Sequence, residues 1–208
     1  MKTKTFVLLI VLFIALFVLG FIGFQFYMKQ EYTPGAENIA KSKVAVIYCS
    51  YGEGLKGMVD IVKNKTNADL FELKSAVAYP TDKEKFAERI KNENNDLSSV
   101  ILDNQDINIR KYKFFIFATP VIQNKACPVL QKLINDNSSR FKNKATAYFV
   151  LYDDKKDNPK ETTDFFYYRL YESRQKPGFM TLKRGQQQLN YEIKLWLDNM
   201  RFKREELR

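Results

Sequence analysis

The sequence predicts an α/β protein: a three-layer sandwich around a five-stranded parallel sheet, preceded by one N-terminal transmembrane helix. Two patterns carry this prediction. Short, continuously apolar runs, typical of strands buried on both faces, alternate with segments whose apolar residues recur at helical spacing. Strands that alternate with helices are joined by right-handed crossovers and form a parallel sheet. A longer apolar run precedes them and predicts the transmembrane helix.

In the N-terminal run, 20 of the 23 residues from 6 to 28 are apolar, and no charge falls between Lys4 and Lys29. About 20 apolar residues in a helix are enough to cross a bilayer. The alternative is a cleaved signal peptide, whose apolar core is usually about 7–15 residues and ends at small residues. The length of the run and the lack of a clear cleavage site favour a retained signal anchor.

The membrane orientation is nearly balanced by charge, since two lysines precede the run and three follow within about 15–20 residues. A very short basic tail usually stays in the cytoplasm, so we expect a single-pass protein whose main domain is extracytoplasmic. The expected parts are a short basic tail (1–5), the transmembrane helix (6–28), a polar linker (29–42), the α/β domain (43–200) and a charged C-terminal tail (201–208).

Within the domain, runs of β-branched and aromatic residues predict strands over residues 43–48, 69–74, 113–118, 145–151 and 179–183. Stripes of apolar residues predict helices over residues 54–65, 162–172 and 189–200. Two further helices have start signals. Thr81 and Glu84 have the spacing of a capping box, and Pro128 suits the first position of a helix.

The composition excludes several kinds of chemistry. The 208 residues contain no histidine and two cysteines. Without histidine there is no Ser-His-Asp or Cys-His catalysis and no HExxH zinc site. Two cysteines outside a CxxC motif cannot form a four-thiolate metal site. We therefore assign no catalytic residue and no metal site, and expect any chemistry to come from a bound cofactor, carboxylates, Lys or Tyr.

Ligands of open parallel sheets bind beyond the carboxyl ends of the strands. The segments KVAVIYCS, ADLFELKSAVAYP, INIRKYKFFIFATPV, CPVLQKLI and YEIKLWLDNM resemble, in order and spacing, the flavodoxin family over essentially the whole domain. The resemblance implies the strand order 2-1-3-4-5 and the binding of flavin mononucleotide (FMN) for electron transfer. It directs attention to the loops after the first, third and fourth strands.

In the family, the first loop reads approximately S/T-x-T-G-x-T and wraps the phosphate at a helix N-terminus. Here the candidate residues are Ser50, Tyr51, Gly52, Glu53, Gly54 and Leu55. Two hydroxyls of the family pattern are lost. A hydrogen bond from such a hydroxyl to a charged acceptor contributes about 1.5–3 kcal/mol to binding. Glu53 replaces a usual glycine and would repel the phosphate unless it points away. The two glycines still permit a backbone nest, although a tight turn explains them equally well.

The other two loops lack the aromatic residues that flavodoxin relatives commonly place beside the flavin ring. The second contributes Thr119, Pro120, Val121, Ile122, Gln123 and Asn124. Val121 and Ile122 are candidates to pack on a flavin face, and Asn124 or Gln123 to hydrogen-bond its edge. In the third loop Tyr152 is the only stacking candidate, and a core position is the alternative.

Cys49 closes the first strand and Cys127 precedes a helix start. The implied strand order brings the two loops close together, so a disulfide is compatible with an extracytoplasmic domain. The alternative of two small buried residues is favoured. A catalytic thiol at Cys127 is not expected, because no histidine is present to act as a base.

The net charge is +10, with +3 on residues 1–30 and +7 on residues 31–208. Most of these charges are expected on solvated faces. The basic runs at 155–156 and 201–204 are candidates for contact with anionic lipid headgroups, at about 1 kcal/mol per basic residue. Nucleic-acid binding is not expected, because the aromatic-rich run at 165–169 is better explained as a helix core face.

Two hypotheses of different class follow. The first is a membrane-anchored flavodoxin-like electron carrier or flavin-dependent reductase that binds FMN and exchanges electrons with a redox partner that the sequence does not identify. The second is a degenerate flavodoxin-like domain without flavin, acting as a binding or structural module at the cell envelope. Ser50 and the loop glycines favour the first hypothesis. Glu53, Leu55 and the missing loop aromatics favour the second.

Overall fold

The computed structural model describes residues 2–28, 32–49, 51, 54–103, 107–141, 144–153, 155–170, 178–186, 188–205 and 207. These residues divide into two compact units, one within residues 1–32 and the other within residues 33–208.

The first unit is a single helix, α1 (Lys2–Met28), which confirms the predicted helical state of the apolar run. Its large apolar side chains are exposed, with fractions of 72% for Phe13 and 70% for Phe17. The side chains of α1 are described from residue 12 to residue 25, and within the part of the chain so described no helix is both long and apolar enough to cross a membrane. The transmembrane span therefore stays a prediction.

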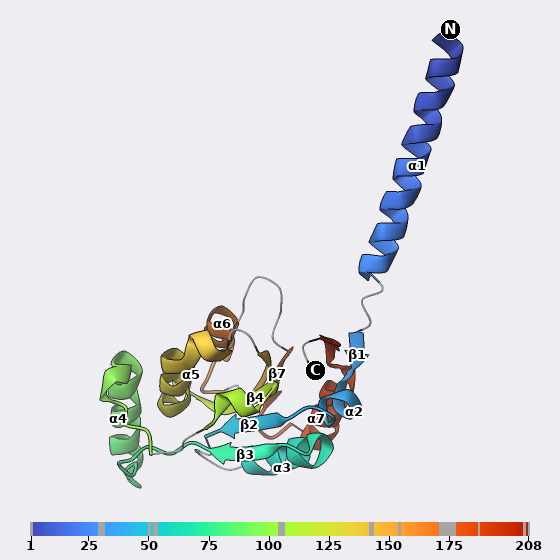
Figure 1. Ribbon diagram of the computed structural model, residues 1–208. Helices are drawn as coiled ribbons and strands as arrows, with labels where there is room; N and C mark the ends of the chain where they lie inside the picture. Colours follow the sequence, from blue (N-terminus) through green and yellow to red (C-terminus); the bar gives the residue numbers. More distant parts are fainter. Residues whose placement is uncertain are drawn as a thin grey trace. The chain divides into compact units, whose positions relative to one another are not determined.

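The second unit contains a parallel sheet in the order β3-β2-β4-β6-β7 (Figure 1). Its strands are β2 (Val44–Tyr48), β3 (Asp69–Glu72), β4 (Phe114–Ile122), β6 (Ala145–Tyr152) and β7 (Gly178–Lys183). Counted along the chain, these five strands lie in the order 2-1-3-4-5. The strand count differs from the prediction, because β4 continues past residue 118 and pairs antiparallel with the short β5 (Lys125–Ala126).

Helices cover both faces of the sheet. One face packs against α2 (Gly35–Ile39), α3 (Leu55–Thr66) and α7 (Leu189–Asn199). The other packs against α5 (Pro128–Phe141) and α6 (Lys160–Leu170), as Figure 1 shows. Successive residues of β2 alternate between the two faces, Val44 and Val46 toward the first core and Ala45 and Ile47 toward the second. Both faces are therefore buried, which is why the strands are continuously apolar.

Three further elements complete this side of the domain: α4 (Lys83–Asn95) and the 3₁₀ helices η1 (Leu97–Ser99) and η2 (Ile109–Lys111). Helix α4 begins one residue later than the capping box predicts. Asp82 is its N-cap, and the Asp82 carboxylate accepts a hydrogen bond from the Lys85 backbone N–H at 3.0 Å. Helix α5 begins at Pro128, as predicted.

The predicted linker over residues 29–42 differs from the structure, because β1 (Tyr32–Pro34) and α2 are ordered elements. Strand β1 pairs with β8 (Arg201–Lys203), so the predicted C-terminal tail is also partly folded. The close packing explains this difference. A Cβ atom on Gly35 would overlap the Leu197 carbonyl oxygen, so only glycine permits the approach of α2 to α7.

Candidate functional site

The first candidate loop leads from β2 into α3. Gly54 is the N-cap of α3 with a φ of +99°, a conformation that favours glycine. Since Gly54 has no side chain, the N-cap residue itself offers no side-chain cap to α3. Backbone N–H groups at such an end point outward and attract anions. Ser50, Gly52 and Glu53 lie outside the described residues.

Leu55 lies in the first turn of α3, and its side chain is fully buried in the core between the sheet, α3 and α7. This burial accounts for the loss of the hydroxyl that the family pattern has at this position. The Leu55 side chain packs the domain, so only its backbone N–H is left to face a ligand.

The second candidate loop is a tight hairpin. Gln123 and Asn124 have φ values of 53° and 68°, and this pair of positive angles is typical of the two-residue type I′ turn between β4 and β5. Thr119 is buried, and its Oγ1 accepts a hydrogen bond from the Cys127 backbone N–H at 3.0 Å. Pro120 and Val121 are buried as well. These three residues therefore shape the hairpin, while Ile122 and Asn124 are half-buried.

The second loop is tied to the third. Asn124 Oδ1 accepts a hydrogen bond from the Asn158 backbone N–H at 2.7 Å. The Asn124 carbonyl accepts another from the Thr162 hydroxyl at 3.0 Å. Tyr152, the predicted stacking residue, is half-buried at the carboxyl end of β6. The structure thus brings Asn124 and the loop that follows Tyr152 together.

Cys49 and Cys127 form a disulfide with their Cα atoms 6.9 Å apart. The favoured prediction of two unpaired buried residues is therefore wrong. Both cysteines are fully buried, as expected, but the adjacency of β2 and β4 brings them within bonding reach. The disulfide links the end of β2, where the first loop starts, to the residue before α5.

A cluster of polar and aromatic side chains surrounds Tyr51, and the sequence analysis missed it. The Tyr51 ring packs edge-on against Tyr79, with centroids 4.7 Å apart, and against Phe86 at 6.1 Å. The Tyr79 hydroxyl donates to Glu93, which is 5% exposed. Arg89 donates from Nε to Glu93 Oε1 at 2.8 Å and lies 4.1 Å from the centre of the Tyr79 ring. The one available signal was the Arg89–Glu93 spacing of four residues on a helix.

Burial raises the pKa of Tyr51 to about 12. Burial, followed by its hydrogen bond to Glu93, also raises the pKa of Tyr79. Both phenols are therefore neutral at physiological pH. The Tyr51 Oη is buried, and the Tyr79 hydroxyl and the Ser75 backbone lie close enough to it to offset part of the rise in its pKa. This polar atom sits on the residue between Ser50 and Gly52, within the first candidate loop.

Two cavities lie at the opposite, amino edge of the sheet. One, of about 550 Å³, is lined in part by Asp69, Lys111 and Tyr112. The Asp69 carboxylate accepts hydrogen bonds from the Tyr112 hydroxyl at 2.6 Å and from Lys111 Nζ at 3.0 Å, and these bonds lower the pKa of Asp69. The other cavity, of about 430 Å³, is lined by residues of η2, α5 and the start of β6.

Neither a family model nor a curated protein matches this sequence. Solved structures do. A flavoprotein from Lactobacillus acidophilus NCFM, solved in complex with FMN, is 17% identical with a TM-score of 0.56, covering 74% of this chain and 98% of that one. A protein from Bacteroides eggerthii DSM 20697 assigned as a flavoprotein is also 17% identical, with a TM-score of 0.58 and coverages of 76% and 96%. This likeness shows that the chain has the flavodoxin-like α/β fold.

Proposed function

We propose that this chain binds FMN at the carboxyl edge of its sheet and acts in electron transfer. The observation that carries the proposal is the junction of β2 and α3. There, a glycine at positive φ, which offers no side-chain cap of its own, begins a twelve-residue helix next to the strand at which the sheet order reverses. Such a junction offers backbone N–H groups to a phosphate. The likeness to a flavoprotein solved with FMN supports the same assignment.

The described residues fit the group. The α3 N-terminus would hold the phosphate through its backbone N–H groups. Ile122, Asn124 and Tyr152 are half-buried and are left as the ring contacts, since the loop residues from 119 to 121 are buried. The exposed Gln123 side chain is engaged elsewhere, because its Nε2 donates to the Ala87 carbonyl at 2.9 Å. When bound, the flavin supplies the electron and hydride chemistry. The protein residues bind it, orient it and exclude water.

The test is a titration of the full chain, kept in a mild non-ionic detergent, into FMN. We expect quenching of the flavin fluorescence and a yellow protein after gel filtration. Tyr152→Ala should weaken FMN binding about threefold to tenfold, in line with an aromatic contact of about 0.5–1.5 kcal/mol. The matched control is Tyr168→Ala, because Tyr168 is 75% exposed on α6. A chain that neither quenches the flavin nor retains its colour at high micromolar FMN refutes the proposal.

A second candidate function is a flavin-free binding or structural module. It is favoured by the second loop, which is a closed hairpin held to the third loop by Asn124 and contains buried Thr119 and Val121. Such a loop has less freedom to open around a ring than the loop that the sequence predicts. The same titration decides between the two candidates, because only the first retains the cofactor.

We also propose that α1 holds the chain at a membrane with the domain outside the cytoplasm. The exposure of Phe13 and Phe17 supports an apolar surrounding for the helix, and the Cys49–Cys127 disulfide supports an oxidising compartment. If so, alkaline carbonate should leave the chain in the membrane fraction. Release into the supernatant would refute the anchor.

The charged surface bears on possible partners. Lys155 and Lys156 are exposed and would contact anionic lipid headgroups, as would Arg201. Phe202, in contrast, is 6% exposed and packs against Phe114, so the run 201–204 does not present its aromatic ring. A redox partner would dock at the carboxyl edge of the sheet, beside the proposed FMN site.

A further inference from the structure

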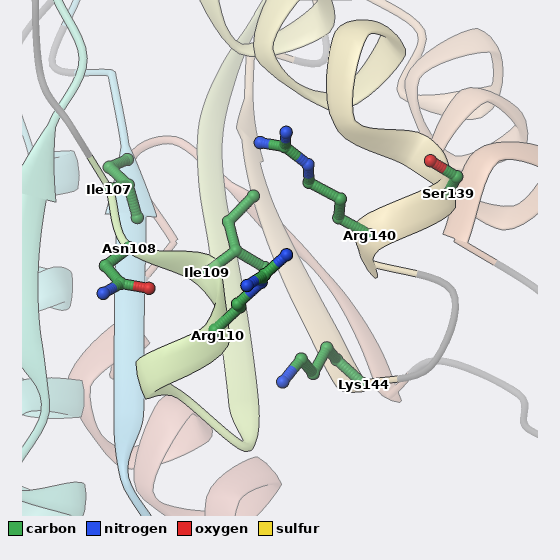
Figure 2. A pocket seen from close by; sticks show the side chains of 7 residues that line it. All are labelled: Ile107, Asn108, Ile109, Arg110, Ser139, Arg140 and Lys144. Atoms are coloured by element: carbon green, nitrogen blue, oxygen red, sulfur yellow. The ribbon is translucent and has the colours of Figure 1, made fainter.

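The cavity of about 430 Å³ at the amino edge of the sheet is unusually basic, and the proposed function does not use it. Figure 2 shows its lining side chains, which are Ile107, Asn108, Ile109, Arg110, Ser139, Arg140 and Lys144. A volume in this range suits a small molecule.

Three cations reach this cavity from three separate segments. Arg110 belongs to η2 and Arg140 to the last turn of α5, and Lys144 is the residue just before β6 (Figure 2). Across the described ranges of the chain, none of the three forms an ion pair with a carboxylate. The fold therefore gathers about three positive charges around one space without a described counter-charge.

Local hydrogen bonds position two of these side chains but use only some of their N–H donors. Lys144 Nζ donates to the Tyr112 carbonyl at 2.9 Å, and an ammonium group has three donors. Arg140 Nη1 donates to Asn137 Oδ1 at 3.1 Å, and a guanidinium group has five. Burial, and next the charge of Lys113, lower the pKa of Lys144. That direction is the one expected for a cation whose surroundings lack an anion.

We propose that this cavity binds the phosphate group of a small organic phosphate. The guanidinium groups of Arg110 and Arg140 would donate to the phosphate oxygens, and Lys144 would add a point charge. The Ser139 hydroxyl is a further donor in the lining, while Ile107 and Ile109 offer an apolar surface to the carbon part of the ligand. A nucleic-acid backbone fits less well, because it requires a stripe of charge along a surface rather than one concave site.

The experiment is a calorimetric titration of the full chain in detergent, without flavin, at constant ionic strength. The probes are inorganic phosphate, phenyl phosphate and a water-soluble short-chain phosphatidic acid. We expect phenyl phosphate or the short-chain lipid to bind more tightly than inorganic phosphate. Preference between these two identifies the source of the phosphate as a soluble metabolite or a lipid headgroup. No saturable binding of any probe overturns the proposal.

Variants locate the binding. Arg110→Gln and Arg140→Gln should each weaken the organic probes at least tenfold. Arg169→Gln is the matched control, because Arg169 is also the basic residue in the last turn of a helix, α6, and lies outside the cavity lining. Equal weakening by Arg169→Gln, or none by Arg140→Gln, overturns the assignment.

A second measurement keeps the test valid if a variant loses affinity by misfolding. Without ligand, Arg140→Gln removes one of three charges that repel one another, so its melting temperature should equal or exceed that of the wild type. Saturating phenyl phosphate should then raise the melting temperature of the wild type but not of this variant. A variant that melts well below the wild type without ligand would contradict an unpaired cationic site.

Discussion

Removing the Cys49–Cys127 disulfide should destabilise the domain strongly. The two cysteines are the only ones in the sequence, they are fully buried, and their bond closes a segment with a sequence separation of 78 residues. A cross-link stabilises a fold mainly by restricting the unfolded chain, and the effect grows with the length of the closed loop. Replacing either cysteine or both by alanine removes this cross-link.

The loop length sets the magnitude. For 78 residues, the chain-entropy relation gives a contribution of about 4.5 kcal/mol to the free energy of unfolding at 25 °C. A domain of this size has a urea dependence of about 2 kcal/mol per molar, so the midpoint should fall by about 2 M. Because a single cysteine cannot form the bond, Cys49→Ala, Cys127→Ala and the double variant should fall by nearly the same amount.

The assay is urea unfolding of the full chain in detergent, followed by circular dichroism. The wild type, unfolded and refolded with a thiol reductant, should match the variants, since reagents reach the buried sulfurs only in the unfolded state. A thiol count in denaturant should be near zero before reduction and two afterwards. The reasoning is refuted if the wild type has two reactive thiols before reduction, or if the effects of the single variants add up in the double variant.

Two further predictions concern charged side chains. Arg89→Met leaves the buried Glu93 carboxylate without its cation and should lower the free energy of unfolding by about 3 kcal/mol, whereas the exposed-pair control Lys132→Met should change it by less than about 1 kcal/mol. Equal urea midpoints for the two variants would contradict this network. Asp69→Asn should destabilise the domain at neutral pH, because the hydrogen bond from Tyr112, and next the one from Lys111, lower the folded pKa of Asp69. The stabilisation is present above the unfolded pKa near 3.8 and is lost as the pH falls through the folded value, so the wild-type and Asp69→Asn midpoints should converge in acid; a pH-independent difference would count against the assignment.

The framework of the fold is readable from the sequence because its signals are local. The continuously apolar strand around Ile47 reports burial on both faces, and Pro128 marks a helix start by its own geometry. Leu55 is the first residue of the apolar stripe that continues at Met58, Val59 and Val62, so its local pattern already favours a core position over a phosphate ligand. Its burial depends on α7, which is distant in sequence.

The features that the sequence did not predict depend on distant pairs. From the sequence, Gly35 is predicted to lie in a linker. Its role depends on the Leu197 carbonyl, which lies against it only in the folded domain. The basic cavity joins Arg110, Arg140 and Lys144, which belong to three segments whose approach only the tertiary structure reveals. Periodicity and turn signals describe single elements, so they do not predict contacts between segments that are distant in sequence.

The pairing of β1 with β8 has a consequence for the order in which the domain forms during synthesis. The Thr33 hydroxyl donates to the Phe202 carbonyl at 3.1 Å, and the Ser42 hydroxyl donates to the Leu207 carbonyl at 2.6 Å. These contacts join the first residues of the domain to be translated with the last. While the ribosome still holds the C-terminal residues, β2, β3 and β4 have already emerged and can pair, since folding begins at the N-terminal side of a nascent chain. The segment that follows α1 must then stay unpaired until the residues from 201 to 207 have emerged.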